Sequence, residues 1–147
     1  MCGVEIPSDV GLLGHSDADA AVHAVMDAVL GALALGDIGK LFPDNDERYK
    51  DADSMKLLSE VVGIMRGRGF LLGNLDVTII AEKPRLADYI GRMRENLAGA
   101  FSADVGCVSV KATTEEGLGL AGDGIGAYAV LLLEQDPNGA RWFTKKL

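Results

Sequence analysis

The sequence predicts one α/β domain, an α+β sandwich in which helices cover one face of a mixed four-stranded sheet. The 147 residues are 48% hydrophobic, which suits a single domain with a sizeable core. Apolar runs with helical spacing alternate with shorter runs that resemble strands, in the order β-α-loop-α-β-α-β-β. We assign residues 1–135 to this domain and residues 136–147 to a C-terminal tail.

Three segments are predicted as helices. The first spans residues 16–35, with a capping box at its start and Gly36 as a left-handed cap. The second begins near residue 54 and ends at Gly67 or Gly69, and the third is opened by Pro84. The positions expected to face the core on the second and third helices are Leu58, Val61, Val62, Met65, Leu86, Tyr89, Ile90, Met93 and Leu97.

Four segments are predicted as strands. Residues 4–6 form the tail of a strand that Pro7 stops, because proline cannot donate to a ladder. Residues 75–82 alternate apolar and polar side chains, and residues 107–113 and 125–134 supply two more strands around a glycine-rich turn. Between the first two helices, the segment 37–53 is predicted as a long ordered loop.

Composition excludes several classes of function. The formal charge of −8 argues against a nucleic-acid or anionic-membrane partner, since no basic face is available. No apolar run is long enough to span a membrane, and the N-terminus does not resemble a signal peptide. Cys2 and Cys107 are far apart and form no disulfide framework, so we expect a cytoplasmic protein.

Both histidines of the chain lie in or beside the first predicted helix. Asp19, His23 and Asp27 have the spacing i, i+4, i+8 and share one stripe of that helix. His15 and Ser16 stand at its N-terminus, where free N–H groups favour anions. The stripe is either the solvated edge of an amphipathic helix or part of a site for an anion and a metal.

Three further segments combine polar side chains in ways that suit a ligand. Residues 37–44 place a glycine and a lysine between carboxylates, as a loop that holds a sugar or phosphate would. Residues 81–85 join a strand to a helix, and residues 111–117 end a strand with two hydroxyls and two acids. An ordinary loop, an ordinary strand–helix junction and a polar strand end are the plainer interpretations of the three.

Four stretches taken together carry a family resemblance. They are GLLGHSDADAAVHAVMDAVLGA, LGDIGKLFPDND, GNLDVTIIAEKP and VKATTEEGLG, in uninterrupted order between Cys2 and about Glu134. In these stretches the chain resembles the 2-C-methyl-D-erythritol 2,4-cyclodiphosphate synthases of the non-mevalonate isoprenoid pathway. The resemblance implies a chorismate mutase-like fold and a homotrimer about a three-fold axis, with active sites between subunits.

The resemblance also implies a reaction. The 2-phosphate of 4-diphosphocytidyl-2-C-methyl-D-erythritol 2-phosphate attacks the β-phosphorus of the same molecule, which gives the cyclic diphosphate and CMP. A zinc ion and a magnesium or manganese ion would neutralise charge on the transferring group, so an acidic protein could bind this polyanion. Such an enzyme is a phosphorus–oxygen lyase.

Roles carry over by position from the family to this chain. His23 matches a zinc ligand, Glu116 matches the residue that holds the second metal, and His15 and Thr114 match the two stabilisers of the transition state. The remaining matches concern substrate binding. At the attacking phosphate and the methylerythritol they are Ser16, Asp37, Ile38, Gly39, Phe42, Pro43, Asp44, Asn45 and Asp46. Around the cytosine and the diphosphate they are Ala81, Glu82, Lys83, Pro84, Arg85, Leu86, Ala87, Thr113, Glu115 and Leu120, the last of which replaces a usual aromatic residue.

Two features depart from the family pattern. The family opens with a glycine-rich strand whose Asp-x-His supplies two more zinc ligands, and the given chain has no such motif near Cys2-Gly3-Val4. The turn 118–127 carries Asp123 where the family has an arginine. We interpret the first departure as a truncated sequence that should hold zinc weakly. The competing hypotheses are a non-catalytic trimeric paralogue that binds cytidine nucleotide or prenyl phosphate, and a subunit fused to or associated with the pathway cytidylyltransferase.

Overall fold

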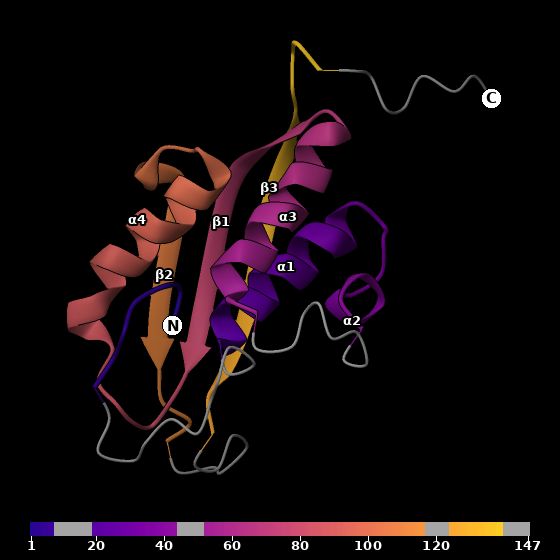
Figure 1. The fold of residues 1–147 in the computed structure, drawn as a ribbon. Coiled ribbons are helices and arrows are strands. Elements are labelled where there is room, and N and C mark those ends of the chain that lie inside the picture. Colours follow the sequence, from indigo (N-terminus) through magenta and orange to yellow (C-terminus); the bar gives the residue numbers. More distant parts are fainter. Residues whose placement is uncertain (8–18, 44–51, 117–123, 140–147) are drawn as a thin grey trace.

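The computed structural model describes residues 1–7, 19–43, 52–116 and 124–139. It confirms an α/β arrangement of helices on a mixed sheet (Figure 1). The elements in chain order are α1 (Ala20–Ala32), α2 (Ile38–Leu41), α3 (Ser54–Gly67), β1 (Phe70–Ile80), the 3-10 turn η2 (Ala87–Tyr89), α4 (Ile90–Phe101), the 3-10 turn η3 (Val105–Cys107), β2 (Val108–Thr113) and β3 (Gly126–Gln135).

The described strands form one three-stranded sheet with the order β2-β1-β3. β2 runs parallel to β1, and their last paired residues are Ile80 and Thr113. β3 runs antiparallel to β1, so that its first residue, Gly126, also pairs with Ile80. The carboxyl ends of β1 and β2 and the start of β3 therefore lie at the same end of the sheet.

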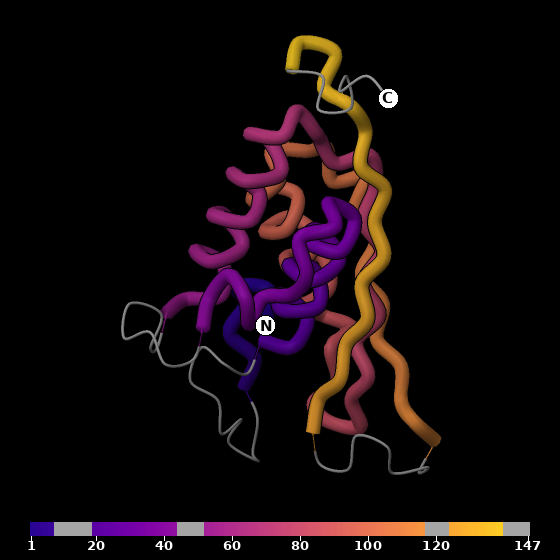
Figure 2. The backbone as a smooth tube through the Cα atoms, turned by 90° about the vertical axis from the view of Figure 1, so that its right-hand side faces the viewer, coloured from indigo at the N-terminus to yellow at the C-terminus, as the bar shows by residue number. Residues whose placement is uncertain are grey.

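The helices pack on one face of the sheet, as the turned view in Figure 2 shows. Leu75, Val77 and Ile79 of β1 point into this layer and are at most 1% exposed. Val25, Met26, Val61, Met65, Met93 and Leu97 meet them from α1, α3 and α4, all fully buried. Burial of these side chains is the main source of the stability of the domain. None of the helices in the described residues is long and apolar enough to cross a membrane.

The opposite face of the sheet, which we call the open face, bears a different set of residues. Tyr128, Val130 and Leu132 of β3 are 66–71% exposed on it. The register places Thr78, Asp76 and Asn74 of β1 directly across from them, and Ser109 and Lys111 of β2 beyond. The open face is thus apolar along β3 and polar along β1 and β2.

The prediction of a strand at residues 4–6 is wrong for the described chain. Val4 and Ile6 are buried and alternate with exposed neighbours, as they would in a strand. Their backbone pairs locally instead, since the Val4 N–H donates to the Met1 carbonyl at 2.9 Å. The segment lies between α4 and the starts of α1 and α3, where the Asn96 amide donates to the Cys2 carbonyl at 2.8 Å. The described sheet accordingly has three strands and not four.

Several boundaries also differ from those expected. The first helix begins at Ala20 and ends at Ala32, because the Asp19 carboxylate caps it by accepting the Val22 N–H. Gly36 does adopt a positive φ of 95°, but four residues after the helix end. Pro84 does not open a helix, since the 3-10 turn Ala87–Tyr89 precedes α4. The second helix matches its prediction from Ser54 to Gly67.

Candidate active site

The ends of β1 and β2 hold two of the predicted substrate segments together. Beyond the last pair of the ladder, the Ala81 N–H donates to the Thr113 carbonyl at 3.0 Å. The Glu82 carboxylate then accepts the backbone N–H of Glu115 at 2.9 Å. The predicted cytosine turn (residues 81–87) and the predicted diphosphate segment (residues 113–116) are therefore neighbours, as parallel strands require.

The diphosphate segment presents its polar groups to solvent. Thr113, Thr114 and Glu116 are exposed, and the Thr114 hydroxyl donates to the Glu116 carboxylate at 2.9 Å. Glu116 has a φ of 52°, in the left-handed region that side chains other than glycine rarely adopt. The Thr114 hydroxyl and the Glu116 carboxylate thus lie side by side, which suits a polar ligand with a bound metal cation.

The cytosine turn combines a buried anchor with exposed cationic groups. Leu86 is buried at 4% exposure and fixes the turn to the core. Lys83 and Arg85 are exposed on either side of Pro84, whose peptide bond with Lys83 is cis. The turn therefore offers two positive charges beside the acids of the diphosphate segment, and a phosphorylated ligand could contact both.

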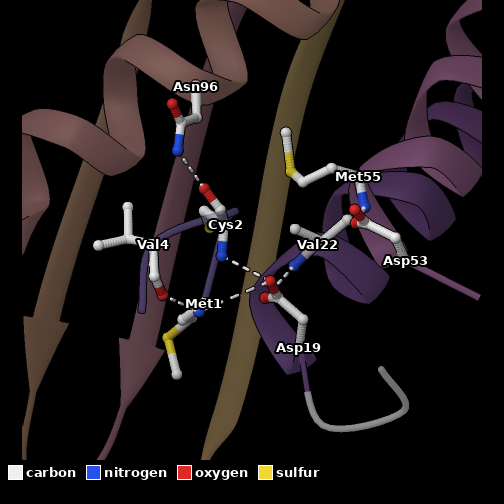
Figure 3. Close-up of polar contacts among 8 residues, drawn as sticks. All are labelled: Met1, Cys2, Val4, Asp19, Val22, Asp53, Met55 and Asn96. Carbon is white, nitrogen blue, oxygen red and sulfur yellow. Dashed lines mark hydrogen bonds and ion pairs between the residues drawn. The ribbon is translucent and has the colours of Figure 1, made fainter. Parts of the chain in front are cut away.

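The three-residue stripe on α1 does not act as one ligand set. Asp19 is used at the helix start, where its carboxylate accepts the Cys2 N–H at 2.5 Å and the Val22 N–H at 3.1 Å (Figure 3). Burial, and next the nearby Asp19 carboxylate, raise the pKa of the Cys2 thiol to about 12. Cys2 is therefore an inert core residue and offers no thiolate ligand.

His23 and Asp27 have separate surroundings on the same helix. Asp27 is exposed, and its carboxylate accepts the Ile38 N–H at 2.8 Å. This bond fixes the turn at residues 37–41 against α1. His23 is half-buried, one turn before Asp27. The contacts described above use the carboxylates of Asp19 and Asp27 but not the imidazole of His23. Of the three stripe residues, His23 is therefore the candidate metal ligand.

The predicted methylerythritol loop is partly described. Asp37 caps α2 by accepting the Lys40 N–H at 3.0 Å, and Ile38 is held by Asp27. Gly39 is exposed, Pro43 is half-buried and Phe42 is buried at 8% exposure. Figure 1 shows α2 on the other side of α1 from the β1–α4 connection that contains the cytosine turn. The described residues thus form two separate groups of candidate site residues.

Several predicted site residues lie outside the described residues. They are His15, Ser16, Asp44, Asn45, Asp46 and Leu120, together with Asp123 of the 118–127 turn.

Within the described ranges, no three His, Cys, Asp or Glu side chains gather closely enough to hold a metal ion. Those residues therefore do not by themselves fit a zinc site, which normally needs three protein ligands in an enzyme. His23 and Glu116 stay single candidate ligands.

Two hydrogen bonds near the candidate site were not predicted from the sequence. The bond between Glu82 and Glu115 joins residues 33 positions apart, and the bond between Asp27 and Ile38 gives a stripe residue a structural partner. The i, i+4 spacing of His23 and Asp27 shows only that they share a helix face, and no local pattern points to either contact.

Comparison with known proteins shows the family of the chain. The profile of the YgbB family matches residues 1–134. A 2-C-methyl-D-erythritol 2,4-cyclodiphosphate synthase of Trichlorobacter lovleyi is 60% identical over 135 residues, covering 90% of this chain and 86% of that protein.

Solved structures share the fold. The bifunctional IspDF from Campylobacter jejuni superposes with a TM-score of 0.84 at 40% identity, over 91% of this chain and 37% of that longer one. A cyclodiphosphate synthase in its CDP-bound form superposes with a TM-score of 0.82 at 36% identity, over 90% of this chain and 87% of that one. The chain belongs to the YgbB family, whose members similar to it are 2-C-methyl-D-erythritol 2,4-cyclodiphosphate synthases.

Proposed function

We propose that this protein converts 4-diphosphocytidyl-2-C-methyl-D-erythritol 2-phosphate into 2-C-methyl-D-erythritol 2,4-cyclodiphosphate and CMP. The observation that carries the proposal is the junction of the cytosine turn and the diphosphate segment at the ends of β1 and β2. A nucleoside diphosphate needs contacts to its base and to its phosphates a few ångströms apart, and this junction brings together the two segments that we predict to make them. The similar solved synthase in its CDP-bound form supports the same ligand class.

The reaction needs positioning more than covalent chemistry. The attacking phosphate and the β-phosphorus belong to one flexible molecule, so the site must hold them in line and offset their charge. In this structure the Thr114 hydroxyl donates to the Glu116 carboxylate, and in our proposal it donates to a phosphoryl oxygen once the substrate is bound. Lys83 and Arg85 would offset negative charge at the nucleotide. The displaced group is CMP, and no bond to the protein forms.

Metal dependence is part of the proposal. His23 is our candidate zinc ligand and Glu116 our candidate for a magnesium or manganese ion. Since no three ligand-type side chains gather in the described residues, each site requires groups from outside them. A bound divalent cation would add the positive charge that an acidic chain otherwise lacks.

We propose a homotrimer in which neighbouring subunits complete each site. Tyr128, Val130 and Leu132 form a row of large exposed side chains on the open face, which suits burial against another copy. The two separate groups of site residues, around α2 and around the ends of β1 and β2, are consistent with half-sites from different copies. Association with the pathway cytidylyltransferase is a further proposal, which the similarity to a bifunctional protein supports.

Two measurements test the function. Titration calorimetry should detect CDP binding by the chain, and Thr114→Ala should weaken it, whereas Ser59→Ala, which removes an exposed hydroxyl from α3, should not. Chromatography should detect CMP released from the substrate with zinc and magnesium present. We expect more release when an Asp-x-His strand is added ahead of Met1.

The outcomes separate the hypotheses. CDP binding without CMP release from either form would favour a non-catalytic paralogue. Absence of CDP binding by an intact assembly would contradict the proposed site.

A further inference from the structure

Glu82 links two segments that the fold brings together only at their ends. The β1–β2 ladder stops at the pair Ile80 and Thr113, and one backbone bond from Ala81 extends it. The Glu82 side chain then adds the next link, because its carboxylate accepts the Glu115 N–H at 2.9 Å. Glu82 thus continues the connection between β1 and β2 beyond the last backbone hydrogen bond between them.

The diphosphate segment lies largely at the surface, so polar contacts hold it more than burial does. Thr113, Thr114 and Glu116 are exposed, so burial contributes little to their positions. Glu116 has a left-handed backbone, a strained conformation that persists only where surrounding contacts fix it. Its carboxylate in turn accepts the Thr114 hydroxyl at 2.9 Å. A bond at Glu115, between these two residues, therefore sets the orientation of both side chains.

We infer that Glu82 is a positioning residue that makes the cytosine turn and the diphosphate segment one unit. Its carboxylate holds the Glu115 N–H and thereby fixes the Thr114 hydroxyl relative to Lys83 and Arg85. A carboxylate so near a diphosphate would repel it, so the role of Glu82 is geometric and not one of attraction. Charge-assisted hydrogen bonds are short and strong, which suits this role. The inference rests on the proposed function for the identity of the ligand.

The test compares Glu82→Ala with Glu82→Gln, because the amide oxygen of glutamine can still accept the Glu115 N–H. Amide exchange at Glu115, followed by NMR, reads the bond directly without any ligand. We expect Glu82→Ala to speed this exchange and to weaken CDP binding about tenfold. Glu82→Gln should retain the protection and bind CDP at least as well as Glu82→Ala. Glu95→Ala, which removes an exposed carboxylate from α4, should change neither quantity.

A double-mutant cycle separates positioning from general destabilisation. If Glu82 acts through Thr114, the loss of CDP affinity caused by Thr114→Ala should shrink in the Glu82→Ala background. A purely structural role would leave the two losses additive.

Unchanged exchange at Glu115 in Glu82→Ala, or additive losses, would overturn the inference. By contrast, a wild-type chain that binds no CDP would refute the proposed function, while faster Glu115 exchange in Glu82→Ala would still support the positioning of the segment.

Discussion

The two faces of the sheet use alternate residues of the same strands but have opposite surroundings. On the covered face, Leu75, Val77 and Ile79 are at most 1% exposed beneath the helices. On the open face, Tyr128, Val130 and Leu132 are 66–71% exposed although they too are largely apolar. The covered face accounts for the folding of one chain, whereas the open face has apolar surface that a single chain leaves in water. The comparison separates residues needed for folding from residues available for assembly.

The largest effect should come from truncation on the covered face. Ile79→Ala removes a fully buried side chain from the central strand and leaves a cavity, so we expect a loss of about 2–5 kcal/mol in the free energy of unfolding. Thr78→Ala, one residue earlier and on the open face, should cost less than about 1 kcal/mol. Urea denaturation of both variants gives the two values. Equal losses would contradict the division of the sheet into two functional faces.

A charge on the open face should instead act on assembly. Val130→Asp places a carboxylate in the middle of the exposed apolar row, where burial against another copy would leave it unpaired. We expect the wild-type chain to sediment as three copies and the variant as one, with the same far-UV circular dichroism. Val105→Asp makes the same substitution at an exposed valine of η3, which is 41% exposed outside the open face, and should leave the mass unchanged. A wild-type monomer at micromolar concentration would rule out the trimer.

The sequence predicted helices and strands well where a regular apolar spacing was bounded by a clear capping residue. α3 has apolar residues at helical spacing and an Asp53 cap, and it was predicted almost to the residue. β1 was predicted too short, because the register shifts between Leu72 and Asn74 and the alternation is interrupted there. The segment 4–6 has the burial pattern of a strand without a partner strand in the described chain. Periodicity reports burial, and it does not report which backbone receives the hydrogen bonds.

The candidate site was predictable in part for a similar reason. That residues 81–87 and 113–116 meet follows from two parallel strands that end together. The different hydrogen-bond partners of Asp19 and Asp27 could not be predicted from the sequence. Regular spacing along a helix shows that side chains share a face, but not what they contact. The bond from Glu82 to Glu115 depends on where two distant strands end, and only the fold supplies that position.

The smallest effect concerns the polar part of the open face. Lys111 donates to the Asp76 carboxylate at 2.6 Å, and both side chains are well exposed, at 55% and 42%. This bond, together with one from Ser109, holds the pKa of Asp76 below its ordinary value of 3.8. Since solvent screens exposed pairs, we expect a coupling of only about 0.2–1 kcal/mol from a double-mutant cycle of Asp76→Asn and Lys111→Met.

The direction in which the coupling between Asp76 and Lys111 changes with pH can also be checked. A carboxylate whose pKa is lowered by folding stabilises the protein above its unfolded pKa, and this stabilisation disappears as the pH falls through the lower folded value. The coupling should therefore be constant between pH 7 and pH 5 and should decline below about pH 3.8. Urea denaturation across this range measures it, with 1 M salt as a second condition that should weaken it further. A coupling that grows as the pH falls would mean that Asp76 is stabilised in its protonated form, and the polar part of the open face would then need a different explanation from an exposed ion pair.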